Sequence, residues 1–327
     1  MAGPKVSVLI PVYNREHLVR HSIESALAQT ESDIELVVVD NCSTDRTYEV
    51  VQEYARKDHR IRAHRNERNI GPVANWLRCV ELSRGQYTKI LFSDDWMEPT
   101  AIESLLGPLQ GRSDVGFAYS SVCGHLAGEN PVVWYARQMC GRFPSMDFLW
   151  GHVTNENVPV TPCAALVRRS DLLSTLTLEI PNKFGMNCSS YGIGNDALIL
   201  WRCCERYRSV YHVGQPQVHL TEPEIDEPGI STSLIRSGHA EKLSLCYRIA
   251  FAHFLANSTL APAVKRSLHT AMLIESLSPS RPAKSIRGLV QFSRLFPEKY
   301  KFWELQLDAR VLRFAINHFS SIAKRLS

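Results

Sequence analysis

The feature that most constrains this chain is a set of short apolar segments that each end in polar side chains. The most informative one is residues 87–92, a largely apolar run that ends in Asp94 and Asp95. Such a run predicts a buried strand of a parallel sheet. Because open α/β sheets bind ligands at the carboxyl ends of their strands, the two carboxylates indicate a site for a hard divalent cation and a diphosphate. An acidic turn without a ligand is the alternative.

Strands and helices are expected to alternate along the first third of the chain, which predicts a parallel sheet with right-handed crossovers. The expected strands are 6–10, 34–39, 61–65 and 87–92, and the expected helices are 15–29, 44–56 and one that begins at Pro72. Further on we expect a short helix at 98–109 and strands at 115–120, 161–167 and 209–213.

The charge distribution suggests a domain boundary. Residues 231–327 hold fifteen Lys/Arg and five Asp/Glu, a net charge of +10, whereas residues 1–230 hold the other 22 basic and 28 acidic residues, a net charge of −6. The 327 residues are enough for roughly two domains. We therefore predict one domain at 1–230 and a basic, helical extension at 231–327.

Cysteine use and hydropathy suggest a location. The nine cysteines are an odd number, and the only adjacent pair, Cys203 and Cys204, can neither bridge easily nor share a zinc ion. The first eight residues lack an apolar leader, and no apolar run reaches the length of a membrane span. We expect a cytoplasmic protein with reduced thiols, with the inner face of the cell membrane as a further possibility.

Four motifs together resemble the inverting glycosyltransferases of family 2, which have the GT-A fold. In order they are Leu9–Asn14, Val37–Asp40 followed by Ser43–Asp45, Asn69–Gly71, and Leu91–Asp95. The resemblance implies an α/β, Rossmann-like, mostly parallel central sheet flanked by helices, here with a C-terminal α-helical extension. No Gly-x-Gly-x-x-Gly follows the first strand, which argues against a dinucleotide-binding domain.

The resemblance also implies which residues bind the nucleotide-sugar. They are Pro11, Tyr13, Asn14, Asp40, Asn69, Gly71, Ser93 and Asp94. Asp40 matches the aspartate that accepts a hydrogen bond from the base, usually uracil, whose imide N–H suits a carboxylate. A turn or helix-capping role is the alternative for Asp40. Arg65 and Arg68 are expected on the solvated surface.

The metal site implied by the resemblance consists of Asp95 and His219. Asp95 ends the motif that corresponds to Asp-x-Asp, although Phe92 stands where many members have an earlier aspartate. Mn²⁺ or Mg²⁺ needs only one or two carboxylates besides phosphate and water. His219 lies shortly after the last expected core strand, where a family histidine often completes the metal site. An unremarkable loop histidine is the alternative, and His212 competes for the role.

The catalytic base implied by the resemblance is Asp196. The step Gly194-Asn195-Asp196 enters an amphipathic helix and is similar to the family's Glu-Asp motif, with Asn195 in place of the glutamate. Inversion by single displacement requires one carboxylate at the acceptor hydroxyl. The alternative is an aspartate that only stabilises a helix N-terminus. The next candidates for the base are Glu156, Glu179 and Asp171.

The basic extension has two interpretations. Residues 303–326 show an apolar stripe opposite a polar one, which suits packing against the catalytic domain or a second subunit. A basic amphipathic helix also suits an anionic membrane surface. Nucleic acid is not expected as a partner, because the basic residues are spread over several helices rather than interleaved with aromatic residues.

We therefore expect an inverting, metal-dependent transferase that moves a sugar from a nucleotide-diphospho-sugar, with UDP-sugar favoured, to a glycan or lipid-linked acceptor in surface polysaccharide or lipopolysaccharide synthesis. A sugar nucleotidylyltransferase is one alternative, but residues 11–15 lack the basic signature that would hold a triphosphate. A catalytically silent binding or scaffold protein of the same fold is the other. The joint presence of Asp40, Asp94, Asp95 and Asp196 argues against it.

Overall fold

The computed structural model describes residues 3–125, 129–136, 140–154, 157–182, 185–221, 229–230, 233, 237–238 and 240–276. Its strands are β1 (Val6–Val12), β2 (Ile34–Asp40), β3 (Ile61–Arg65), β4 (Tyr87–Ile90), β5 (Trp96–Met97), β6 (Val115–His125), β7 (Val132–Trp134), β8 (Gly141–Pro144), β9 (Ala165–Arg168) and β10 (Ser209–Thr221). Its α-helices are α1 (Val19–Leu27), α2 (Thr47–Lys57), α3 (Pro72–Leu82), α4 (Ala101–Leu106), α5 (Ser145–Val153), α6 (Arg169–Thr175), α7 (Asn195–Arg206), α9 (Ala240–Asn257) and α10 (Pro262–Ser276). Short 3₁₀ turns lie at Pro162–Ala164 and Cys188–Ser190.

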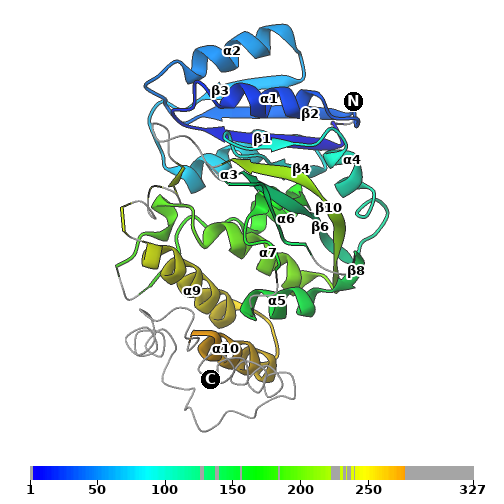
Figure 1. Cartoon of the computed structure of the whole chain (residues 1–327), viewed down its shortest axis with the longest axis vertical. Helices are drawn as coiled ribbons and strands as arrows, with labels where there is room; N and C mark the ends of the chain where they lie inside the picture. Colours follow the sequence, from blue (N-terminus) through cyan, green and yellow to red (C-terminus); the bar gives the residue numbers. More distant parts are fainter. Residues whose placement is uncertain are drawn as a thin grey trace.

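A single twisted sheet runs through the molecule (Figure 1) in the order β3-β2-β1-β4-β9-β6-β10-β5, with β7 beside β6 and β8 beside β10. The first four strands of this order pair in parallel. Strand β9 is antiparallel to both of its neighbours, and β6 and β10 are again parallel to each other. The expected α/β fold, a central sheet flanked by helices, is confirmed, with a parallel half and a mixed half.

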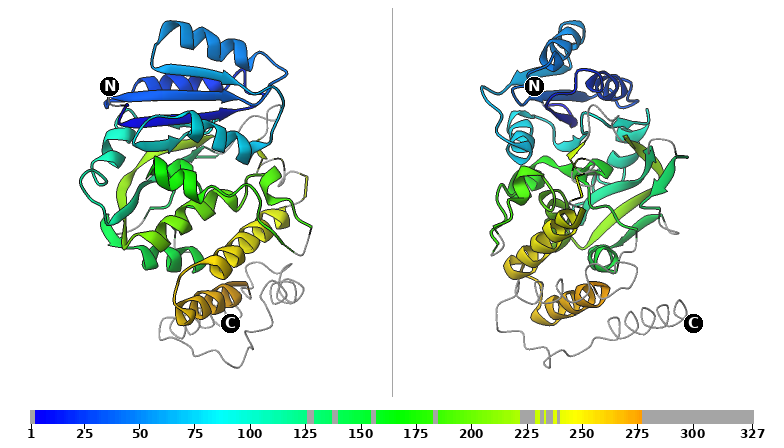
Figure 2. Two further views of the ribbon diagram at one scale, coloured as in Figure 1. Left: turned by 180° about the vertical axis from the view of Figure 1, so that it is seen from behind. Right: turned by 60° about the vertical axis from the view of Figure 1, so that its left-hand side comes forward.

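Helices cover both faces of the sheet (Figure 2). On β1 the side chains alternate between two hydrophobic clusters: Leu9 belongs to the cluster that also holds residues of α3, α5, α6, α7 and α9, whereas Val8 and Ile10 belong to the cluster that holds residues of α1, α2 and α4. Strand β2 alternates in the same way, and both strands are buried along their whole length. This two-sided burial explains why their sequences are continuous apolar runs.

Strand β1 extends further than the sequence predicted, because it continues through Pro11 to Val12. The Leu9 carbonyl accepts a hydrogen bond from the Leu91 N–H, so the polar groups of Leu9 face β4. Those of Pro11, two residues on, face the same side. Strand β4 has ended at Ile90 by then, so the missing N–H of proline breaks no ladder bond.

The second half of the sheet departs from the prediction in two places. Residues 209–213 and 217–220, expected as a strand and a separate segment, form one strand, β10, whose pairing with β6 contains register shifts. Residues 161–167, expected as a strand, divide into the 3₁₀ turn at Pro162–Ala164 and the short strand β9. Proline favours the first turn of such a helix, which accounts for the division.

The described part of the C-terminal extension packs onto the rest of the chain. Phe251 and Phe254 of α9 lie against Trp201 of α7, with ring centroids 5.0 and 6.0 Å apart, and all three side chains are fully buried. Helices α9 and α10 belong to the same hydrophobic cluster as α5 and α7. The boundary at residue 230 stays a prediction, and the amphipathic segment 303–326 lies outside the described residues. Among the helices described, none is long and apolar enough to cross a bilayer.

We predict that Phe254→Ala destabilises the whole protein by about 3–5 kcal/mol, because it opens a cavity between α9 and α7. Urea unfolding of the full chain measures this. Lys242→Ala, at a partly exposed position of the same helix, is the control and should change stability by no more than about 0.5 kcal/mol. Equal effects of the two variants would show that α9 does not stabilise the fold.

Candidate active site

The carboxyl ends of β1, β2 and β4 lie side by side at one edge of the sheet. Strand β1 pairs with β2 up to Val12 and Asp40, and with β4 up to Leu9 and Ile90. The chain order 3-2-1-4 reverses direction at β1, and this is the point where open α/β sheets bind ligands. The segments after β1, β2 and β4, which carry the motifs singled out in the sequence, therefore gather at this edge.

Asp40 is the last residue of β2 and is fully buried. Its carboxylate accepts hydrogen bonds from the Ser43 N–H and hydroxyl, and Arg65 Nε lies 3.2 Å from Oδ2. Burial raises the pKa of Asp40, and the Ser43 and Arg65 contacts oppose that shift. Arg65 is exposed, as the sequence predicted, but its guanidinium also reaches the buried Asp40, which the sequence did not predict.

The turn after β1 is fastened to the turn after β2. The Asn14 N–H donates to Ser43 Oγ at 2.9 Å, and Asn14 Oδ1 accepts from the Thr44 N–H at 2.9 Å. Asn14 adopts φ = 51°, a left-handed conformation that asparagine tolerates better than most residues. Tyr13 is 40% exposed, so its ring is available to a ligand, whereas Pro11 is buried within β1.

Asn69 and Gly71 belong to a second polar network beside this edge. Asn69 Oδ1 accepts hydrogen bonds from Asn41 Nδ2 and from the Gly71 N–H, both at 2.9 Å. Gly71 precedes Pro72 at the start of α3 with φ = 84°, which only glycine adopts readily. No atom lies within 4 Å of where a Cβ would stand. The backbone conformation, rather than crowding within the protein, therefore accounts for this glycine.

Asp94 and Asp95 lie in the turn that follows β4. Asp95 is buried, and its carboxylate accepts hydrogen bonds from the Thr221 N–H at 3.2 Å and from Cys163 Sγ at 3.4 Å. Burial raises the pKa of Asp95 well above its usual range, and the negative charge of Asp94 adds to the shift. Burial also raises the pKa of Asp94, which Arg15 partly offsets. Two adjacent carboxylates in this state would be stabilised by a bound cation.

A buried lysine, Lys89, lies beneath this pair and was not singled out from the sequence. Lys89 belongs to β4, is fully buried, and donates to the Cys163 carbonyl. Burial lowers the pKa of Lys89, whereas the nearby Asp95 raises it. Ser93, between the strand and the two carboxylates, is also buried. A lysine inside an otherwise apolar run was the only sequence signal for this group.

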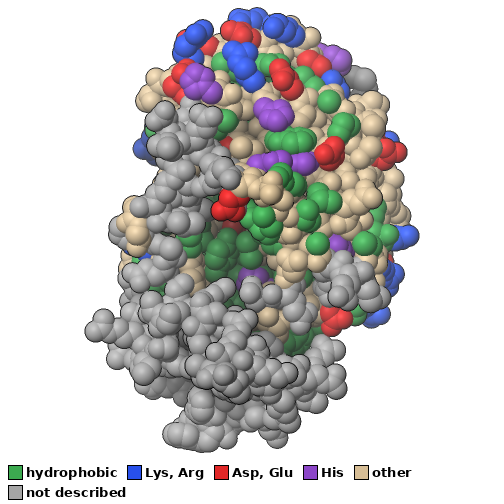
Figure 3. Space-filling view, viewed as in Figure 1, with side chains coloured by type: hydrophobic (Ala, Val, Ile, Leu, Met, Phe, Trp, Pro, Cys, Tyr) green, Lys and Arg blue, Asp and Glu red, His purple; other side chains and the backbone are tan. Residues whose placement is uncertain are grey.

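His219 lies within strand β10 rather than in a loop. Its Nε2 is 2.8 Å from Glu98 Oε1, its Nδ1 is 2.8 Å from His125 Nε2, and its ring stacks 3.5 Å from the ring of Trp96. Burial lowers the pKa of His219, and the Glu98 contact opposes this. Several histidine side chains gather on this face of the molecule (Figure 3). Both ring nitrogens thus have partners other than Asp95, and the shared metal site stays a prediction.

Asp196 lies in the first turn of α7, as the sequence predicted. Its Oδ1 accepts from the N–H groups of Gly194 and Ala197, both at 2.8 Å, and its Oδ2 accepts from the Tyr247 hydroxyl at 2.9 Å. Burial raises the pKa of Asp196 to about 7, although all three hydrogen bonds act in the opposite direction. A carboxylate with a pKa near neutrality has the proton affinity that a general base requires.

Tyr247 comes from α9, and no sequence pattern connected it to Asp196. The contact requires a close approach of α9 to the start of α7. At Gly194, with φ = 87°, a Cβ would stand 2.7 Å from Ala250 Cβ and 2.9 Å from the Cys246 carbonyl oxygen. A glycine is therefore required at residue 194 both for its backbone conformation and for this packing.

The other candidates for the catalytic base have other partners, are exposed, or lie outside the described residues. Asp171 forms an ion pair with Arg206 at 3.3 Å and accepts from the Tyr207 hydroxyl at 2.8 Å. Glu179 is exposed, and Glu156 lies outside the described residues.

His212, the competitor of His219, is fully buried. Its ring stacks on Tyr119 with centroids 4.7 Å apart, and its Nε2 lies 3.3 Å from Ser121 Oγ. These contacts place it in the core between β6 and β10.

Comparison with known proteins identifies the family. The sequence model described as "Glycosyl transferase family 2" matches residues 7–173, about half of the chain. The chain belongs to glycosyl transferase family 2. The match begins in β1 and ends in α6, so it includes the edge of the sheet that carries Asp40, Asp94 and Asp95.

Curated relatives match the same part of the chain. The putative glycosyltransferase EpsH of Bacillus subtilis is 34% identical over 116 residues, 35% of this chain and 33% of that protein. The uncharacterized glycosyltransferase MJ1057 of Methanocaldococcus jannaschii is 36% identical over 124 residues, 37% of this chain and 43% of that protein. The matched segments thus span less than half the length of these relatives.

A solved structure matches over a larger part of the family 2 chain. The crystal structure of Staphylococcus aureus TarS 1–349 in complex with UDP-GlcNAc superposes with a TM-score of 0.67 at 18% identity and covers 90% of this chain and 82% of that one. At this identity the match shows the fold, which agrees with the GT-A architecture expected from the sequence.

The raised pKa of Asp196 predicts a pH-dependent stability difference between the wild type and Asp196→Asn. The pKa is 3.8 in the reference state and about 7 in the fold. Ionisation in the fold therefore costs stability as pH rises from about 4 to 7, by on the order of 2–4 kcal/mol. Asparagine cannot ionise. Its amide oxygen can accept from the same two N–H groups, and its amide nitrogen would donate to the Tyr247 hydroxyl oxygen.

Urea unfolding at pH 5 and pH 8 measures this difference. We expect Asp196→Asn to gain stability relative to the wild type between the two pH values. Glu179→Gln, at an exposed position, is the control and should show no such trend. A stability difference for Asp196→Asn that is the same at both pH values would contradict the raised pKa.

Proposed function

We propose that this family 2 protein is an inverting glycosyltransferase that moves a sugar from a nucleotide-diphospho-sugar to a glycan or lipid-linked acceptor. The observation that carries the proposal is the carboxylate of Asp196 in the first turn of α7, which has a pKa of about 7 and accepts a hydrogen bond from the Tyr247 hydroxyl. A general base and an acidic site for the diphosphate are what a single displacement requires.

The donor nucleotide would occupy the edge formed by the ends of β1, β2 and β4. Asp40, after exchanging one partner, would accept the imide N–H of a uracil base, so we favour a UDP-sugar. The exposed ring of Tyr13 offers an apolar face for the base. Pro11, Asn14, Asn69, Gly71, Ser93 and Asp94 would form the remaining wall around the nucleotide-sugar.

A hard divalent cation, Mn²⁺ or Mg²⁺, fits the acidic turn after β4. Asp95 would hold the ion, because its carboxylate oxygens are the ligands that such an ion prefers. The cation would also offset the repulsion between the charges of Asp94 and Asp95. His219 would join Asp95 only if its Nε2 left Glu98. When bound, the ion would neutralise charge on the diphosphate.

Asp196 would act as the general base. Its ionised carboxylate would accept the proton of the acceptor hydroxyl while the hydroxyl oxygen forms a bond to the anomeric carbon. The bond from the anomeric carbon to the diphosphate breaks in the same step, and the diphosphate leaves with the electron pair. One displacement inverts the anomeric configuration.

The class of acceptor is suggested by relatives with informative names. They include the putative teichuronic acid biosynthesis glycosyltransferase TuaG of Bacillus subtilis and the chondroitin synthase of Escherichia coli, 34% and 38% identical over 110 and 116 residues. We extend to this chain a role in surface polysaccharide or lipopolysaccharide synthesis. A basic extension, residues 231–327, would suit work at the cytoplasmic face of a membrane that holds a lipid-linked acceptor.

We predict that Asp196→Asn lowers sugar transfer by about 10²–10⁴-fold and leaves donor binding nearly unchanged, because a general base acts in the transition state. Transfer assays and calorimetric titration with UDP measure the two effects. Asp171→Asn, which alters a buried ion pair away from Asp196, is the control for a general loss of stability. Turnover of Asp196→Asn within a few-fold of the wild type would place the base elsewhere.

We predict that Asp95→Asn abolishes the metal dependence of UDP binding, whereas Asp40→Asn weakens UDP binding with or without metal. The first change removes the negative charge that would hold the ion, and the second replaces the carboxylate that would accept from the base with a neutral amide, which is a weaker acceptor. Calorimetric titration of both variants, with Mn²⁺ and with chelator, separates the two roles. Metal dependence that persists in Asp95→Asn would refute the assignment of Asp95.

A further inference from the structure

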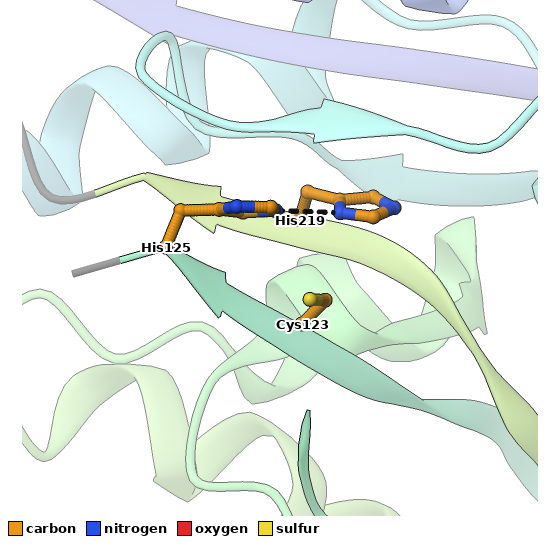
Figure 4. Close-up of side chains that lie close together, drawn as sticks. All are labelled: Cys123, His125 and His219. Carbon is orange, nitrogen blue, oxygen red and sulfur yellow. Dashed lines mark hydrogen bonds between the residues drawn. The ribbon is translucent and has the colours of Figure 1, made fainter. Parts of the chain in front are cut away.

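Three metal-ligating side chains meet where β6 runs beside β10 (Figure 4). Cys123, His125 and His219 place one ligand atom each within 4.8 Å of the others. His219 is paired with Cys123 across the two strands, and Thr221 is paired with His125. Paired residues of neighbouring strands project from the same face, as do residues two apart on one strand. The strand register itself therefore brings these three side chains together.

The ring of His219 is held in a fixed orientation. Its Nδ1 faces His125 Nε2 at 2.8 Å, and its Nε2 faces Glu98 Oε1 at 2.8 Å. The Trp96 ring lies parallel to it, 3.5 Å away and inclined by 4°. A histidine that ligates a metal through one nitrogen commonly has a carboxylate on the other, which sets the tautomer and the ring direction. Glu98 is such a carboxylate for His219, because it contacts Nε2 and leaves Nδ1 to face His125.

We propose that Cys123 Sγ, His125 Nε2 and His219 Nδ1 form a binding site for a borderline-soft divalent cation, best matched by Zn²⁺, with Glu98 orienting His219. One sulfur and two nitrogen donors suit Zn²⁺, whereas Mn²⁺ and Mg²⁺ prefer oxygen donors. Around a tetrahedral zinc ion such donor atoms lie about 3.3–3.7 Å apart, within the observed limit of 4.8 Å.

The ion would replace the hydrogen bond between the two histidines, and their nitrogens would move apart by about half an ångström. Three protein ligands leave a fourth position for water or another ligand. The site would brace β10 two residues before Thr221, whose N–H donates to Asp95. The zinc site therefore borders the acidic turn. Its ligand atoms are sulfur and nitrogen, whereas the ion proposed at Asp95 would be held by a carboxylate oxygen.

The proposal does not depend on the transferase activity. The zinc site uses His219 Nδ1 and keeps Nε2 on Glu98, so with zinc bound the ion at Asp95 would bind without His219. The two sites are therefore tested with residues that belong to only one of them. Cys123 and His125 belong to the site proposed here, and Asp95 belongs to the other.

Cobalt binding to the full chain tests the site, because Co²⁺ occupies zinc sites and reports a thiolate ligand by charge-transfer absorption in the near ultraviolet. After chelator treatment, Co²⁺ alone should give this absorption, and Zn²⁺ should displace it. Cys123→Ser should abolish it, and His125→Gln should weaken Co²⁺ binding strongly. Glu98→Gln should weaken binding by about 10–100-fold, as expected for a group that orients a ligand. Cys140→Ser, at an exposed cysteine outside the cluster, is the matched control and should keep the absorption.

Two results would overturn the proposal. One is the absence of thiolate absorption in the wild type, which would leave only a histidine pair beside a free thiol. The other is absorption that survives in Cys123→Ser or disappears in Asp95→Asn. The two metal proposals fail separately, because Cys123→Ser should keep Mn²⁺-dependent UDP binding and Asp95→Asn should keep the cobalt absorption.

Discussion

The parallel pairing of β1 with both β2 and β4 is the constraint on which the rest of this structure depends. Because the three strands run in the same direction, their carboxyl ends share one edge, and the turns that follow them meet there. The turns are then fastened by side chains: Ser43 connects Asn14 to Asp40. Burial on both faces holds the strands in place, so the polar residues at their ends are positioned by the core rather than by the turns alone.

Charge that is buried without full compensation is the second property of the site. Burial raises the pKa values of Asp40, Asp94, Asp95 and Asp196, and the partners that the fold supplies offset these shifts only in part. Such carboxylates destabilise the fold when ionised, and they cluster at functional sites because the chemistry there requires shifted pKa values. A cation at Asp95 or a proton at Asp196 would relieve the cost, which connects the stability of the protein to its proposed chemistry.

The sequence predicted the strands and helices of the parallel half well, because each strand is a continuous apolar run and each turn carries a recognisable motif. It predicted the position of Asp196 at a helix start for the same reason. It did not predict that Tyr247 would contact Asp196, that Arg65 would contact Asp40, or that Cys123 and His125 would lie beside His219. These contacts join residues 25 to 96 positions apart. They depend on how α9 packs and on the registers of β3 against β2 and of β10 against β6, none of which has a local signature. Pro11 suggested that the first strand ends there. The strand instead continues to Val12, because β4 has already ended at Ile90 and the missing N–H of the proline breaks no ladder bond.

The central claim is that the edge formed by β1, β2 and β4 binds a nucleotide-diphospho-sugar together with a divalent cation. The most direct test is a thermal-shift screen of the full chain with UDP-, GDP- and dTDP-sugars, each with and without Mn²⁺, because a ligand that binds the native state raises the melting temperature by mass action. The account predicts a rise with one nucleotide class, UDP-sugars, that depends on Mn²⁺. No rise with any of the donors, or an equal rise with all three that is independent of metal, would contradict it.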